Sequence, residues 1–205
     1  GFSLLKLAVN TKKKKLGFSF VSGTKRVMKL TEYLGSVEDP QAEVLEGLPV
    51  PEEAAEIFVA RVRRELAFVQ TETGVSDFEI DQNLGDTIAG QYNRQTGVAK
   101  LNADILLEDN IREHVMIHEG LHDQADAKED APLTDVDLIE GLTELSAIKL
   151  DGGKTIGAYD TEVADVIDFA TQTMGSVSEV IEMYKTGQHE ELEKEWDEWK
   201  EKEAA

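Results

Sequence analysis

Three of the four histidines in this 205-residue chain recur at every fourth position, as His114, His118 and His122. Side chains four residues apart project from the same face of an α-helix, about one turn from each other. In a helix, neighbouring imidazoles of this row can therefore reach one ion. We expect this helix over about residues 108–127.

The residue that follows the second of these histidines adds a chemical function to the row. His118, Glu119 and His122 form the pattern His-Glu-x-x-His. In this pattern two imidazoles bind a tetrahedral zinc ion, and the glutamate beside them accepts a proton from the water that the metal activates. The chain has no cysteine, so a transition metal must be held by histidines and carboxylates.

Two imidazoles are not enough for a catalytic zinc site, which takes three protein ligands and keeps one position open. The stretch 123–130 contains no histidine, so a downstream carboxylate is needed. Glu140 is the candidate, on a helix expected over 135–150 that packs antiparallel to the first and is capped by Thr134 or Asp135. Glu144 lies on the same helix face, and it is either an alternative ligand or an acceptor that orients a histidine.

The other polar residues near the motif have more ordinary interpretations. His114 is followed by Val115 and so lacks a neighbouring base; we expect it to support the site from outside the ligand set or to lie on the helix surface. Asp123 and Asp126 should be solvated or support the site in the same way. His189 stands alone in an acidic segment, where we expect it to be solvent-exposed.

The order of the predicted elements indicates the fold class. An amphipathic helix begins at Pro51 and ends before Gly74. Strands follow at 78–80, 87–92 and 98–102, the last two joined as a hairpin by turn residues. Helices come next, at 108–127, 135–150, 160–174, 176–186 and 189–203. A few strands followed by a run of helices predicts an α+β fold, with a short antiparallel sheet before the His-Glu-x-x-His helix and a mostly helical C-terminal half.

Charge divides the chain into two parts. Residues 1–31 hold eight lysines and arginines and no acidic residue, whereas the remainder holds 13 basic and 42 acidic side chains. The remainder of the chain is acidic enough to repel phosphate, and we therefore expect no broad nucleic-acid binding. No stretch approaches twenty apolar residues, so no membrane-spanning helix is expected. The lysine run 12–15 follows the first apolar segment, the reverse of a secretory signal; we expect a cytoplasmic protein, or one that is part of a virion or another assembly.

The basic charge and a change in composition mark off the N-terminal part. We expect residues 1–50 to be an arm and linker, separable from a core domain over 51–205, with a possible short strand at 16–21. Such an arm could contact an acidic protein partner, or it could cover the cleft of its own domain.

The polar helix expected at the C-terminus has one apolar stripe, made by Leu192, Trp196 and Trp199. The stripe either docks the helix on the body of the protein or forms a contact surface for a partner.

The motif followed by the sequence Glu140-Gly-Leu-Thr-Glu144 resembles the gluzincin clan of zinc peptidases. Two further stretches are similar to the small single-domain members: the hairpin that ends in 98–102, and Tyr159-Asp-Thr-Glu-Val. The resemblance covers about residues 51–175. It implies that Glu140 is the third zinc ligand and that the hairpin lies at the sheet edge beside the active-site helix.

The resemblance implies a zinc metallopeptidase that hydrolyses peptide bonds, with Zn²⁺ on His118, His122 and Glu140 and with Glu119 as the general base. Tyr159 is the candidate for stabilising the oxyanion, although it could also be a core tyrosine. Either strand of the hairpin could hold an extended peptide substrate by strand addition. The alternative function is a structural or interaction protein of a larger assembly, such as a virion component, built on a peptidase-like domain.

Overall fold

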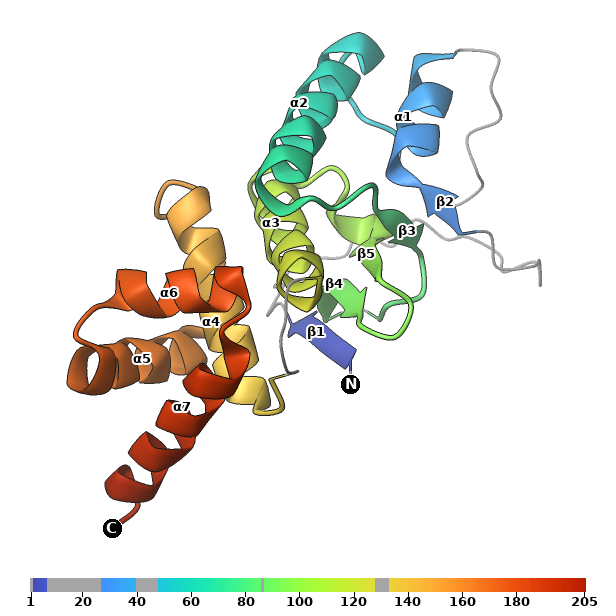
Figure 1. Ribbon diagram of the computed structural model, residues 1–205. Helices are drawn as coiled ribbons and strands as arrows, with labels where there is room; N and C mark the ends of the chain where they lie inside the picture. The colour runs from blue at the N-terminus through green and yellow to red at the C-terminus, as the bar shows by residue number, and fades with distance from the viewer. Residues whose placement is uncertain (1, 7–26, 40–47, 86, 128–132) are drawn as a thin grey trace.

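The computed structural model describes residues 2–6, 27–39, 48–85, 87–127 and 133–205, and of residues 2–6 the backbone alone. A five-stranded sheet and the helices packed on it are followed by a purely helical half (Figure 1). This architecture confirms the α+β prediction. None of the helices in these ranges combines the length and the apolar composition that crossing a bilayer requires.

The predicted hairpin is present as β4 (Ile88–Asn93) and β5 (Val98–Asn102), which pair antiparallel with Tyr92 opposite Ala99. The turn between them closes where the N–H of Gly97 donates to the carbonyl of Asn93 at 2.8 Å. The turn residues at 93–97 thus gave the correct pairing for these two strands.

The other strands make the sheet mixed. β3 (Glu79–Asp81) runs parallel to β5, and β2 (Met28–Lys29) pairs antiparallel with β3. β1 (Phe2–Lys6) pairs antiparallel with β4 on its outer side, so the strand order is β1-β4-β5-β3-β2. Two of the five strands therefore come from the part of the chain that the sequence assigned to an arm.

Helices α1 (Leu30–Glu38), α2 (Ala55–Thr73) and α3 (Asp109–Asp126) share a core with the sheet and with the 3₁₀ turn η1 (Ala103–Ile105). Helix α2 begins four residues later than predicted, because the chain is still extended at Ala54.

The arm predicted for residues 1–50 is wrong for the segment that carries β2 and α1. Leu30, Tyr33 and Leu34 have no exposed surface and lie in the same core as Phe58 of α2. The Tyr33 hydroxyl also donates to the carbonyl of Pro49 at 2.7 Å. The core domain therefore does not begin at residue 51. The lysines of 12–15 and the strand expected at 16–21 lie outside the described residues.

The C-terminal half has a second core, built by four helices that pack on one another. They are α4 (Val136–Leu150), α5 (Asp160–Phe169), α6 (Val177–Thr186) and α7 (His189–Glu203). The single helix predicted over 160–174 instead changes after Phe169 into a π-helical turn, η2 (Ala170–Met174). In Figure 1 these elements form the lower-left half, with α4 next to α3 of the other half.

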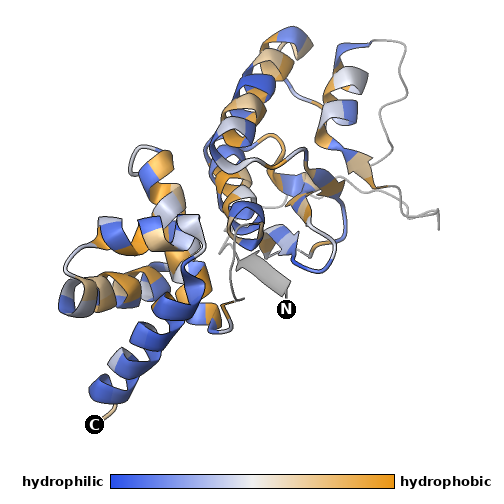
Figure 2. Cartoon of the chain, viewed as in Figure 1, coloured by the Kyte–Doolittle hydropathy of each residue, from blue (hydrophilic) through white to orange (hydrophobic). Residues whose placement is uncertain are grey.

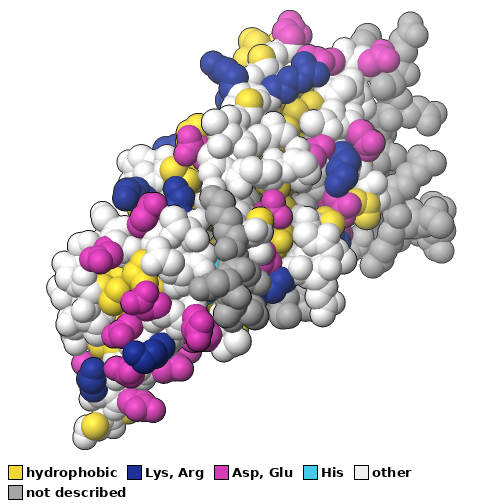
Figure 3. Space-filling model, in the orientation of Figure 1, with side chains coloured by type: hydrophobic (Ala, Val, Ile, Leu, Met, Phe, Trp, Pro, Cys, Tyr) yellow, Lys and Arg dark blue, Asp and Glu magenta, His cyan; other side chains and the backbone are white. Residues whose placement is uncertain are grey.

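Helix α7 is the most polar helix of the described chain, yet it docks on the body. Leu192, Trp196 and Trp199 are buried in the second core, and the indole N–H of Trp199 donates to the side chain of Gln172 at 3.2 Å. The docking interpretation of its apolar stripe is confirmed. Most of α7 is coloured hydrophilic in Figure 2, and acidic side chains gather at this end of the molecule (Figure 3).

Candidate metal centre

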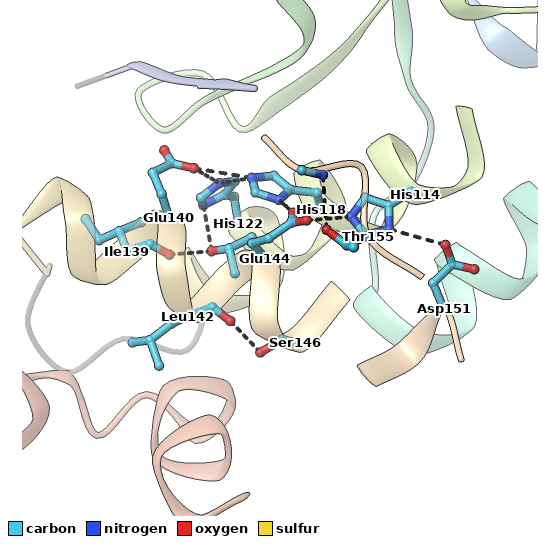
Figure 4. Close-up of polar contacts among 12 residues, drawn as sticks. His114, His118, His122, Ile139, Glu140, Leu142, Glu144, Ser146, Asp151 and Thr155 are labelled. Atoms are coloured by element: carbon cyan, nitrogen blue, oxygen red, sulfur yellow. Dashed lines mark hydrogen bonds and ion pairs between the residues drawn. The ribbon is translucent and has the colours of Figure 1, made fainter. Parts of the chain in front are cut away.

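Helices α3 and α4 pack antiparallel, as their side-chain contacts show. His114 contacts Glu144, His118 lies between Glu144 and Glu140, and His122 contacts Glu140 (Figure 4). Residue numbers rise along α3 as they fall along α4. This register brings the histidine row of one helix against the glutamate pair of the other, as the sequence predicted.

The three predicted ligands converge. Nε2 of His118 lies 3.2 Å from Nε2 of His122 and 3.2 Å from Oε2 of Glu140, and Nε2 of His122 lies 3.4 Å from the same oxygen. Ligand bonds of 2.0–2.1 Å around a tetrahedral zinc put adjacent donor atoms about 3.3 Å apart. The donor separations therefore fit one zinc ion, and the cluster is buried as a whole.

Two glycines allow neighbouring helices to pack closely against α3 and α4, the two helices of the site. A Cβ atom at Gly120 would lie 2.6 Å from the Thr73 hydroxyl of α2, and one at Gly141 would lie 2.5 Å from the Glu162 carbonyl of α5. Each glycine directly follows an acidic residue of the motif in the sequence. These close contacts fix α3 and α4 against their neighbours, and with them the directions of the site side chains.

A chain of buried polar contacts supports His118 from the side away from the other ligands. Its Nδ1 lies 2.9 Å from Oε2 of Glu144, whose Oε1 lies 3.0 Å from Nε2 of His114. The other ring nitrogen of His114 lies 3.2 Å from Asp151, which accepts from Lys154 at 2.9 Å. This geometry favours Glu144 as an orienting acceptor over Glu144 as a ligand, and it places His114 behind the site and not on the helix surface.

His122 has a different support. Its Nδ1 lies 3.4 Å from the hydroxyl of Thr143, which donates to the carbonyl of Ile139 at 2.8 Å and lies 2.6 Å from the hydroxyl of Tyr184. Because the Thr143 proton is used on Ile139, the threonine oxygen is the acceptor for Nδ1–H of His122. That tautomer leaves the lone pair of Nε2 directed at the metal cluster.

The carboxylate of Glu119 is buried without a partner among the described residues. The side chain has no exposed surface, and neither of its oxygens makes a hydrogen bond. It lies against Gly90 of β4, where a Cβ atom would approach one of its oxygens to 2.8 Å. An unsatisfied buried carboxylate is costly, so this group points to a ligand or water that it would bind in the functional protein.

The charges of the metal-free site shift several pKa values. Burial raises the pKa of Glu119 to about 8, and the negative charge of Glu140 adds to this shift while His118 opposes it. Burial would lower the pKa of His118, but its hydrogen bonds to Glu140 and Glu144 outweigh burial and raise it to about 10. A proton on His118 thus takes the place of a cation in the cluster, and metal binding has to displace it.

Tyr159, the candidate for oxyanion stabilisation, is brought to the site. Its ring stacks on His118 with centroids 5.4 Å apart and planes 10° from parallel. Burial raises the pKa of its hydroxyl, and the negative charge of Glu140 raises it further. Tyr159 is 8% exposed and also packs on the first core, so the core interpretation is confirmed, and its role at the oxyanion stays a prediction.

A cleft of about 500 Å³ opens beside two of the ligands, His122 and Glu140. Most of its wall is apolar or aromatic, from Tyr92, Ala125, Leu133, Val136, Ile139 and Tyr184. Arg94 borders it and is paired with Asp126 at 2.7 Å.

His189 also lines the cleft and is buried, with Nε2 donating to the carbonyl of Tyr184 at 2.9 Å. The expectation that His189 is solvent-exposed is therefore wrong, because the docking of α7 on the body covers its first turn, where His189 lies.

Several supporting residues had no signal in the sequence. Thr143 sits in the motif-like stretch, but nothing in the spacing shows that it contacts His122. Asp123 accepts from the hydroxyl of Tyr92 at 3.3 Å, so this aspartate near the end of α3 is tied to the sheet. Asp151 lies just past the end of α4, and its contact to His114 depends on the antiparallel register.

No protein-family model, curated protein or solved structure matches this chain.

Proposed function

We propose that the protein is a zinc-dependent metallopeptidase of the gluzincin type. One observation carries the proposal: an unpartnered, fully buried carboxylate, Glu119, lies next in sequence to a ligand of a cluster whose three donor atoms fit one zinc ion. A base beside an open metal position is the arrangement that metal-assisted hydrolysis needs.

Zinc suits the donor set, because two imidazoles, one carboxylate and no thiolate are typical of catalytic zinc sites. A bound zinc ion would polarise the carbonyl of the scissile bond and make the attacking water more acidic. His118, His122 and Glu140 would hold the ion, and Glu144 and Thr143 would keep the two imidazoles in the required tautomer and orientation.

The remaining chemistry belongs to the chain's own side chains. Glu119 would accept the proton of the attacking water at its carboxylate and donate it to the leaving amine. Its pKa of about 8 applies to the metal-free protein, and a cation nearby would lower it towards the ionised form that a base requires. The Tyr159 hydroxyl would donate a hydrogen bond to the oxyanion.

The test combines metal analysis with a cleavage profile. Full-length protein would be loaded with zinc, its metal content measured, and its products from a peptide library identified by mass spectrometry. One zinc per chain together with cleavage that chelation abolishes supports the proposal. Wild-type protein that is fully loaded with zinc and cleaves nothing in the library would contradict it.

A second candidate function is supported by the burial of the site. His118 and Glu119 have no exposed surface, and His122 and Glu140 are each 4% exposed. A catalytic metal site needs a position that water and substrate can reach, whereas a site as deeply buried as this one suits a structural role. A non-enzymatic component of a larger assembly, with the metal stabilising the junction of α3 and α4, would bind zinc and gain thermal stability from it without any turnover.

A further inference from the structure

The start of α4 is held by side chains from two distant parts of the chain. The carbonyl of Leu133 accepts from Nη1 of Arg94 at 3.1 Å. The backbone N–H groups of Thr134 and Asp135 donate to Oε1 of Glu193 at 2.7 and 3.1 Å. Arg94 directly follows β4, and Glu193 belongs to α7, which lies beside the start of α4 (Figure 1). The sheet and the C-terminal helix therefore both contact the helix that carries Glu140.

Arg94 joins the two helices that supply the metal ligands. Its Nε donates to Oδ1 of Asp126 at 2.7 Å, and Asp126 lies one turn after His122, at the end of α3. Another nitrogen of the same guanidinium holds Leu133, just before α4. The donors of a guanidinium form a rigid, planar fork. This one side chain therefore sets the separation between the end of α3 and the start of α4.

Glu193 supplies a helix cap from a different helix. In a capping box the third residue of the helix provides a carboxylate for the N–H of the cap residue, but the third residue of α4 is Leu138. Glu193 takes its place, and it also accepts from the hydroxyl of Thr134. Lys200, two turns later on α7, donates to Oδ2 of the cap residue Asp135 at 3.0 Å. One face of α7 thus fixes the first turn of α4.

The first turn of α4 determines where Glu140 lies. Glu140 comes five residues after the cap Asp135, about 7.5 Å further along a helix that rises about 1.5 Å per residue. Its Oε2 lies 3.2 Å from Nε2 of His118 and 3.4 Å from Nε2 of His122. Fraying or displacement of the first turn would move this oxygen relative to both imidazoles. The donor separations that fit a metal ion therefore depend on how the start of α4 is held.

We propose that Arg94 and Glu193 are positioning residues of the metal centre, which hold the start of α4 against α3 and α7 and so set the distance of Glu140 from the two histidines. The inference rests on the proposed function for the identity of the ion. It gives α7 a task in the site besides its docking on the second core.

The experiment measures zinc affinity of the full chain by competition with a chromophoric chelator. Loss of a direct partner of a metal ligand costs about 10–100-fold, and these two residues act one step further away. Arg94→Ala and Glu193→Ala should each lower zinc affinity by about fivefold or more. Arg94→Lys should not restore it, because an ammonium keeps the charge but lacks the fork that reaches two helices.

Two further substitutions in α7 are the controls. Glu193→Gln keeps an acceptor oxygen for the N–H groups of α4 and should retain most of the zinc affinity. Glu198→Ala removes the same charge from the helix, but Glu198 pairs with Lys194 of α7 itself, at 3.6 Å. It should leave zinc affinity unchanged.

Two measurements on the chelator-treated protein separate positioning from stability. Hydrogen exchange should become faster at the amides of 138–140 in Arg94→Ala and Glu193→Ala, and it should stay at the wild-type rate in α5. Thermal unfolding shows how far each variant is destabilised. A merely structural role would lower the unfolding temperature and leave the zinc affinity of the folded chain unchanged.

Wild-type zinc affinity in folded Glu193→Ala and Arg94→Lys would overturn the inference, and so would equal losses in Glu193→Ala and Glu198→Ala. These variants keep the inference testable even if Arg94→Ala does not fold. The proposed peptidase function can fail separately: wild-type protein that binds zinc and cleaves nothing would contradict that function, while the differences in zinc affinity would still support the positioning role.

Discussion

Oε2 of Glu144 lies 2.9 Å from Nδ1 of His118, on the side of the imidazole opposite to the nitrogen that faces Glu140. A carboxylate in this position accepts the Nδ1 proton and directs the other nitrogen at the metal cluster. The two glutamates of α4 are therefore expected to have different tasks, although they are one helical turn apart and both are buried.

Replacing the two glutamates should separate these tasks. Glu140→Ala removes a donor atom and should abolish most zinc binding, because a two-ligand site is weak. Glu144→Ala removes only the orienting acceptor and should lower zinc affinity by about 10–100-fold. Competitive titration with a chromophoric chelator measures both values, and the reverse order of effects would make Glu144 the ligand.

Glu119→Gln should retain zinc and the fold and lose hydrolysis. Glutamine has nearly the same shape but cannot accept the proton, and a general base contributes about 10²–10⁴-fold. Glu113→Gln is the control on the same helix, since Glu113 points to Lys154 and not to the cluster. The measurement is the turnover of a library peptide that the wild type cleaves, together with the zinc content of each variant. If Glu119→Gln were as active as Glu113→Gln, the mechanism would be ruled out.

His114 should influence zinc binding without touching the metal. His114→Phe leaves one oxygen of Glu144 and one of Asp151 without their buried partner, so the support of His118 loosens. We expect zinc affinity to fall by about tenfold or more, with partial rescue in His114→Gln, which can still donate one hydrogen bond. A calorimetric zinc titration that gives wild-type affinity for His114→Phe would show that the contact does not reach the metal.

The segment before residue 51 should be required for stable folding. Leu34 is fully buried in the first core, and Leu34→Ala should cost about 2–5 kcal/mol in the free energy of unfolding. Val50→Ala, at an exposed position, should cost little. A chain that begins at Pro51 lacks all of α1 and should aggregate or melt without a cooperative transition. Calorimetry that finds it as stable as the full chain would restore the separable arm.

The stability of the metal-free protein should fall as pH rises from 7 to 9. Glu119, whose pKa is raised from 4.5 to about 8, holds a proton in the folded chain that the unfolded chain has lost. His118, whose pKa is raised from 6.5 to about 10, stabilises the fold below pH 6.5 and loses this contribution as pH approaches 10. Both groups bind more protons when folded, so the free energy of unfolding decreases.

Urea denaturation in the presence of a chelator measures this dependence. Glu119→Gln removes the contribution of one group, so its stability should fall less steeply between pH 7 and 8 than that of wild type. Parallel curves for the two proteins would show that Glu119 does not titrate in this range.

The local features of the site could be predicted from the sequence. The four-residue spacing of His118 and His122 fixes them on one helix face, and the turn residues at 93–97 indicate the β4–β5 hairpin. Such patterns depend on contacts within a few residues or within one turn, where backbone geometry alone decides which side chains meet.

Longer-range contacts were decided only by the tertiary structure. Leu30 and Tyr33 enter the core because a parallel pair, β3 with β5, leaves an edge on which β2 can add. The contact of His114 with Asp151 and the burial of His189 likewise depend on how whole helices pack. The sequence by itself determined which residues can bind a metal and which helix carries each. The packing of α3 on α4 decided their distances and their supports, because those depend on the register between segments that no local spacing encodes.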